Sequence, residues 1–272
     1  MNQTKLIKIE NFYLKREDQN PTGSAKDRAL VAQIQNLIEK KITNAVISST
    51  GNAAISAAYF CQKQGINLTI FVSPKINLKK LSLISPSAKI ITSLKPISDS
   101  FKFSKSQNAY FLRQSTDPSS LIGYQEIAKE ILNQNPQTTS IFIPVGSGTT
   151  LLGISQKLPP HIPIFAIQSA ANPTITSKFN SQYTKETQLI TDALSAKYLP
   201  LKSKILNAIK KSKGTGLTIQ NQQIINSHQH LLDLNVRCSL EGGLTLAGFE
   251  LANKLSLNIG NNPIILITGT LR

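Results

Sequence analysis

Short runs of β-branched and aliphatic residues alternate along the chain with longer segments whose apolar residues recur every three or four positions. The short runs are typical of buried strands and the longer segments of amphipathic helices. Strands are predicted over residues 44–48, 68–72, 89–92, 141–145, 164–168 and 264–268. Helices are predicted over residues 27–40, 52–64, 120–133, 150–157, 221–233 and 245–256.

The regular alternation of strands and helices predicts the α/β class, with mainly parallel sheets and helices on both faces. At 272 residues the chain is long enough for one large domain or two modest ones. It contains no internal repeat and no long linker, so a second domain would arise by insertion. We expect a smaller inserted domain at 44–123, with 1–43 and 124–272 together forming a larger domain that binds a cofactor.

Three segments share one arrangement, in which a predicted strand ends in small or polar residues and a turn follows. They lie at 47–54, 144–153 and 267–270. In α/β folds, ligands bind at the carboxyl ends of the strands. The first turn suits a carboxylate and the second has glycines that let the backbone curl around an anion, so either could hold a phosphate. An ordinary turn explains any one of them equally well.

Lys26 follows a turn at Asn20-Pro21-Thr22-Gly23 and stands where a helix begins. The positive end of a helix disfavours its ammonium form, and desolvation in a cleft would free the amine further as a nucleophile toward an aldehyde. Residue chemistry alone leaves a second interpretation open, in which Lys26 is a solvated lysine near a helix cap.

Four motifs in sequence order carry a family resemblance. The pattern Lys-x-Glu-x-x-Asn-Pro-Thr-Gly-Ser-x-Lys-Asp-Arg runs from Lys15 to Arg28, and Ser-x-Gly-Asn follows at 49–52. A glycine-rich loop lies at 146–150 and a Thr-Gly pair at 268–269. Together they resemble the two-domain, fold-type II pyridoxal-phosphate enzymes, the superfamily of the tryptophan synthase β subunit. The run before Lys26 and the segment 241–248 look most like threonine synthase.

The resemblance implies that Lys26 forms a Schiff base with pyridoxal 5′-phosphate (PLP) and moves protons as acid and base. It implies that Asn52 hydrogen-bonds the phenolic oxygen of the cofactor and that Thr268 faces the pyridine nitrogen. The residues expected to hold the cofactor phosphate are Gly146, Ser147, Gly148, Thr149 and Thr150. Those expected to hold the substrate carboxylate are Ser49, Thr50 and Gly51.

The activity implied is that of a threonine synthase-like lyase, which converts O-phosphohomoserine to threonine and phosphate. A cysteine synthase-like β-replacement and a serine or threonine dehydratase-like deamination are alternatives. A further alternative is a catalytically silent binding protein, because Gly123-Tyr124-Gln125-Glu126 stands where the family often has Gly-x-Lys-Thr. The family usually forms dimers, so a homodimer is expected.

Composition and charge indicate whether the protein binds nucleic acid, metal ions or membranes. The formal charge of +16 is large, and lysines recur without an acid from 197 to 213, but no aromatic residues interleave to stack bases. We therefore expect a solvated lysine face and no nucleic-acid partner. Two isolated cysteines and a His228-x-His230 pair whose side chains point to different helix faces predict no metal site. The absence of a long apolar run predicts a cytoplasmic protein that does not enter membranes.

Overall fold

The computed structural model describes residues 1–272 except 75, 77–80, 85, 181, 192–193 and 197–198. The chain divides into two compact units. The smaller unit comprises Lys26–Gly123 together with Met1, and the larger comprises Asn2–Ala25 and Tyr124–Arg272. The smaller unit is thus inserted in the sequence of the larger one. It includes the first helix, whereas the sequence-based boundary was placed later, at residue 44.

The larger unit is built on a six-stranded sheet in the order β1-β2-β10-β7-β8-β9. β1 runs antiparallel to β2, and the other neighbours are parallel. The strands are β1 (Leu6–Ile9), β2 (Phe12–Arg16), β7 (Ser140–Pro144), β8 (Ile164–Ser169), β9 (Thr215–Ile219) and β10 (Pro263–Ile267).

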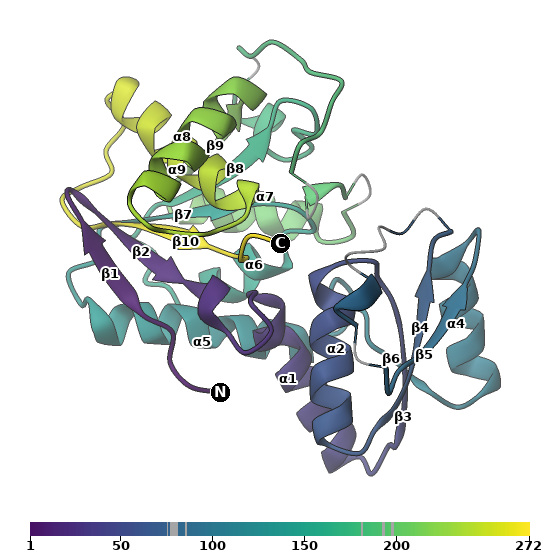
Figure 1. Cartoon of the computed structure of the whole chain (residues 1–272). Coiled ribbons are helices and arrows are strands. Elements are labelled where there is room, and N and C mark those ends of the chain that lie inside the picture. Colours follow the sequence, from purple (N-terminus) through teal and green to yellow (C-terminus); the bar gives the residue numbers. More distant parts are fainter. Residues whose placement is uncertain (75, 77–80, 85, 181, 192–193, 197–198) are drawn as a thin grey trace. The chain divides into compact units, whose positions relative to one another are not determined.

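Helices cover both faces of this sheet (Figure 1). On one face lie α8 (Asn221–Asp233) and α9 (Leu240–Lys254), and on the other α6 (Thr149–Ser155), α7 (Lys202–Lys211) and the later part of α5 (Ser119–Gln134). Two short 3-10 helices, η1 (Glu17–Gln19) and η2 (Thr176–Lys178), follow β2 and β8.

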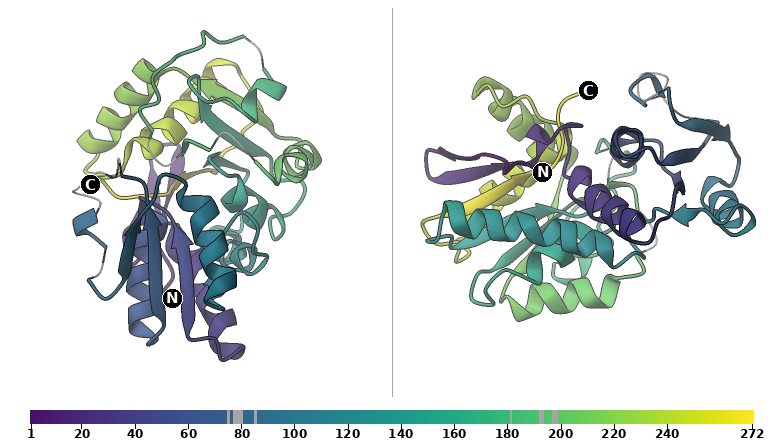
Figure 2. Two further views of the ribbon diagram at one scale, coloured as in Figure 1. Left: turned by 90° about the vertical axis from the view of Figure 1, so that its right-hand side faces the viewer. Right: turned by 90° about the horizontal axis from the view of Figure 1, so that it is seen from below.

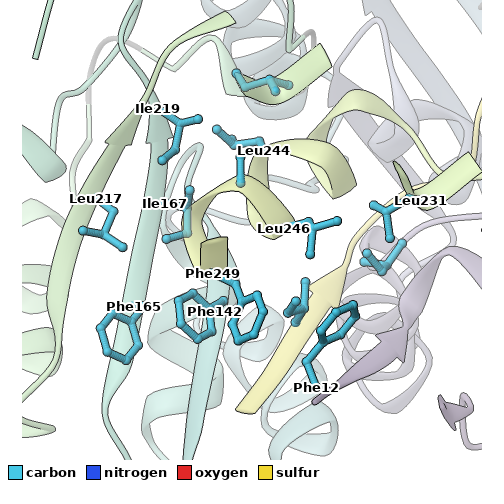
Figure 3. Packing of buried hydrophobic residues seen from close by; sticks show 14 of the residues in the cluster. Phe12, Phe142, Phe165, Ile167, Leu217, Ile219, Leu231, Leu244, Leu246 and Phe249 are labelled. Atoms are coloured by element: carbon cyan, nitrogen blue, oxygen red, sulfur yellow. The ribbon is translucent and has the colours of Figure 1, made fainter. Parts of the chain in front are cut away.

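The core of the larger unit lies between the sheet and α8 and α9. Figure 3 shows the aromatic centre of this cluster. The rings of Phe142 and Phe165 stack at 4.5 Å, and Phe249 of α9 meets Phe12 edge-on at 5.2 Å. Burying each side chain of this size stabilises the fold by about 1.5–3 kcal/mol. This packing therefore holds the strands of the six-stranded sheet firmly in place.

The smaller unit holds a four-stranded parallel sheet in the order β5-β4-β3-β6. The strands are β3 (Asn44–Ser48), β4 (Asn67–Val72), β5 (Lys89–Thr92) and β6 (Tyr110–Phe111). Among its described helices, α1 (Lys26–Glu39) and α2 (Asn52–Lys63) lie on one face of this sheet and α4 (Pro96–Ser106) on the other (Figure 2).

The predicted α/β class, with mainly parallel sheets and helices on both faces, is confirmed. The hydrophobic pattern missed β1, β2, β6, β9, α4 and α7. Part of the lysine-rich segment expected to be a solvated face forms α7, while Lys197 lies outside the described residues. None of the described helices combines the length and apolar character needed to cross a membrane.

Candidate functional site

The segments predicted to bind the cofactor follow three neighbouring strands of the larger unit, so they lie at one edge of its sheet. β10 pairs in parallel with β2 on one side and with β7 on the other. The glycine-rich loop follows β7, Thr268 follows β10, and the segment that leads to Lys26 follows β2. Parallel strands end at the same edge, which is where α/β folds bind ligands.

The glycine-rich loop has the backbone expected of an anion site. Gly148 has a φ of 77°, in the left-handed region, and directly precedes α6. A side chain there would also meet Ile205 of α7, since an added Cβ would lie 2.1 Å from its Cδ1 atom. Both the left-handed φ and the contact with the buried Ile205 side chain therefore favour glycine at this position.

The polar groups of this loop fit a phosphate. Within the described part of the chain, the amides of Gly148, Thr149 and Thr150 donate to no protein acceptor, and no side chain caps α6. The hydroxyls of Ser147 and Thr149 lie 3.0 Å apart. Unsatisfied amides at the start of a helix attract anions, so the residues present suit the phosphate of the implied cofactor.

Backbone hydrogen bonds tie the segment before Lys26 to the end of β10. The Ala25 amide donates to the Thr268 carbonyl at 2.9 Å, and the Thr270 amide donates to the Gly23 carbonyl at 2.9 Å. Gly23 has a φ of 75°, and an added Cβ would lie 2.7 Å from Cγ2 of Thr270. The residue preceding Lys26 is therefore fixed next to Thr268.

Buried polar groups brace the same segment from within. Arg16 donates to Asp18 through Nε at 2.9 Å and Nη2 at 2.7 Å, and this hydrogen-bonded pairing raises the pKa of the guanidinium. The buried Glu17 carboxylate accepts hydrogen bonds from the Thr4 hydroxyl at 2.5 Å and the Asn20 amide at 2.7 Å. Sequence reasoning missed this bracing, although four consecutive charged residues after an apolar strand start were a visible signal.

The smaller unit carries the other predicted site residues. Lys26 is the first residue of α1 and is half-buried, and Asn52 is the first residue of α2. Between β3 and α2, the Gly51 amide donates to the Ser49 hydroxyl at 3.3 Å, and Thr50 is exposed. The predicted carboxylate loop is thus a strand-to-helix turn, as its sequence indicated.

The histidine pair has separate partners. The Nε2 atom of His228 lies 2.7 Å from the Cys238 carbonyl oxygen, and the Nδ1 atom of His230 lies 3.6 Å from Oε1 of Glu250. Among the described residues, no group of three His, Cys, Asp or Glu side chains is arranged to hold a metal ion.

Both cysteines are expected to resist alkylation in the folded protein. Cys61 and Cys238 are buried, and burial raises the pKa of each thiol to about 12. Because the thiolate is the reactive form, iodoacetamide at pH 8 should label neither residue without denaturant and both in urea. Mass spectrometry counts the labels, and rapid labelling of the native protein would contradict the buried placement.

The sequence is similar to known proteins over most of its length. The family described as "Pyridoxal-phosphate dependent enzyme" matches residues 2–269, and the chain belongs to it. The chain is 26% identical to threonine synthase of Methanosarcina acetivorans over 84% of this chain and 62% of that protein. It is 23% identical to L-threonine ammonia-lyase of Thermotoga maritima over 95% of this chain and 66% of that protein.

A solved structure shares the fold. Maize serine racemase superimposes with a TM-score of 0.88 at 18% identity, covering all of this chain and 89% of that one. The chain spans slightly less than two thirds of the length of these two sequence relatives. The chain therefore belongs to a family of enzymes whose cofactor is PLP.

Proposed function

We propose that this protein is a PLP-dependent lyase acting on an amino acid, with the cofactor bound at Lys26. The observation that carries the proposal is the convergence of β2, β10 and β7, which brings the glycine-rich loop, Thr268 and the segment before Lys26 to one sheet edge. In this proposal the loop amides hold the cofactor phosphate and Asn52 donates to the phenolic oxygen. The loop-side phosphate ligands are Gly146, Ser147, Gly148, Thr149 and Thr150.

Lys26, Thr268 and the turn at residues 49–51 would move protons, contact the ring nitrogen and bind the substrate. PLP, when bound, supplies an electron sink that weakens bonds at the substrate α carbon. The Lys26 amine takes the α proton and returns it later in the reaction. The turn at Ser49, Thr50 and Gly51 holds the substrate carboxylate. Thr268 offers a neutral hydroxyl to the ring nitrogen, which favours elimination and replacement over transamination because that nitrogen is not held protonated.

The substrate proposed is O-phosphohomoserine. The β carbon loses a proton, the bond between the γ carbon and the phosphate ester oxygen breaks, and phosphate leaves. The γ carbon then takes up a proton to become the methyl group, and water adds a hydroxyl at the β carbon to give threonine. Support comes from the Asn-Pro-Thr-Gly-Ser run at 20–24 and from the match with a threonine synthase over most of this chain. The positive charge of the protein suits a phosphorylated substrate.

A second candidate is deamination of threonine to 2-oxobutanoate and ammonia. It is supported by the match to an L-threonine ammonia-lyase, which covers 95% of this chain. This reaction would use the same cofactor residues and the same carboxylate turn, but it eliminates the β hydroxyl and then releases the amino group as ammonia, whereas the first candidate releases phosphate from the γ carbon and keeps the amino group.

A substrate panel separates the two candidates. With PLP-saturated protein, we expect phosphate release from O-phosphohomoserine with threonine formed in equal amount, and no ammonia from threonine. Ammonia and 2-oxobutanoate from threonine, without phosphate release, would replace the first candidate by the second. Binding of PLP without turnover of O-phosphohomoserine, O-acetylserine, serine or threonine would overturn the enzymatic proposal and leave the binding protein considered above.

A further inference from the structure

A groove of about 480 Å³ lies in the larger unit between α7, the end of α6 and the loop that follows α6. Its lining includes the buried Leu152 and Leu158 and the loop residue Pro159, which give it an apolar part. Its α7 side carries the exposed polar residues Lys204, Asn207 and Lys211. The volume lies within the range of about 300–1,000 Å³ found for small-molecule sites.

The groove has cations on one side and no acidic residue in the segments that form it. Neither 149–164 nor 202–213 contains an Asp or Glu. The lysine-rich segment expected to be a solvated face therefore supplies one wall of a concavity. Lysines beside an apolar lining attract a ligand that joins an anionic group to an apolar body.

The spacing of the two lysines favours one shared anion. Lys204 and Lys211 are seven residues apart on α7, which is two helical turns or about 10.5 Å along the axis. Asn207 lies about midway between them. Both lysines have long flexible stems, so both ammonium groups can reach one anion bound near Asn207, whose side-chain amide adds a further donor.

We propose that this groove binds a small metabolite that carries a phosphate monoester or carboxylate on an apolar body. The anion pairs with Lys204 and Lys211, and the body lies on Leu152, Leu158 and Pro159. The groove is formed by α6 residues later than the first turn, which belongs to the proposed cofactor site. The inference therefore does not depend on the proposed function.

Phenyl phosphate is the probe for this proposal, measured by calorimetric titration of PLP-saturated protein. It should bind saturably and more tightly than inorganic phosphate, because only the ester has an apolar body. The double variant Lys204→Gln/Lys211→Gln should weaken binding by about tenfold, or about 1.4 kcal/mol, because both charges that pair with the anion are lost.

The matched control is Lys202→Gln/Lys210→Gln, which removes the same charge from α7 outside the groove. It should change the affinity less than about twofold, in the range expected of distant surface charges. Equal loss in both double variants, or equal binding of inorganic phosphate, would overturn the proposal and leave a diffuse basic surface. The paired comparison assigns binding to the groove whether or not the protein takes up PLP.

Discussion

Lys26→Ala should abolish the visible absorption band of the lysine–PLP Schiff base and lower turnover by about 10³-fold or more. The variant loses both the amine that binds the cofactor covalently and the group that moves the α proton, and a positioned acid–base group alone contributes about 10²–10⁴ in rate. The loop at 146–150 is unchanged, so PLP should still bind, but as the free aldehyde. Absorption spectra and turnover of the substrate identified by the panel measure the two effects.

The control for this variant is Lys40→Ala, which removes an exposed lysine just beyond the end of the same helix. Its band and turnover should match those of the unmodified protein. Borohydride reduction followed by peptide mass spectrometry should place the pyridoxyl group on residue 26. A retained band in Lys26→Ala, with the label on another lysine, would refute the assignment.

The α/β class could be predicted because fully buried parallel strands are read directly from apolar runs such as 141–145 and 264–268. β2 was missed because it mixes apolar and charged residues, and Lys15 within it is completely buried. Its Nζ atom pairs with Glu130 at 2.5 Å, a partner 115 positions away. A pairing at that sequence distance leaves no local pattern.

The early start of α9 was missed for a different reason. The pattern predicted a helix from residue 245, but α9 begins at Leu240 and includes Gly242 and Gly243. Glycine lowers helix propensity by about 1 kcal/mol, which argued against helix there. In the fold, an added Cβ at Gly243 would lie 2.6 Å from the Ile224 carbonyl oxygen of α8. Close packing of α8 and α9 therefore outweighs the local preference.

For the candidate site, the motifs identified which residues to examine, and the fold shows how some are held. The larger unit joins the glycine-rich loop and Thr268 through adjacent parallel strands, a register that sequence order alone does not specify. The hydrogen bond from Ala25 to Thr268 was not predictable, because it joins residues that lie far apart in the sequence. The roles of individual residues stay predictions.

Gly123 is a further position where the fold favours glycine, and it packs against the first turn of α1, the helix that begins at the proposed catalytic lysine. It belongs to α5, and an added Cβ would lie 2.0 Å from the Arg28 carbonyl oxygen and 3.0 Å from the Ala29 amide nitrogen of α1. Both neighbours are backbone atoms, so no side-chain rotation relieves the contact. Lys26 lies in the same first turn of α1 as Arg28.

Gly123→Ala should therefore lower the free energy of unfolding by about 3 kcal/mol, the upper end of typical overpacking costs. Moving α1 away from α5 displaces the turn that carries Lys26, so the affinity for PLP should also fall in the fraction that remains folded. Urea unfolding and PLP titration measure the two effects. Gly51→Ala serves as the control for stability, because an added Cβ there meets no atom within 4 Å. Equal stability of the two variants would contradict the close crossing of α1 and α5, whereas loss of stability with normal PLP affinity would show that this crossing does not position Lys26.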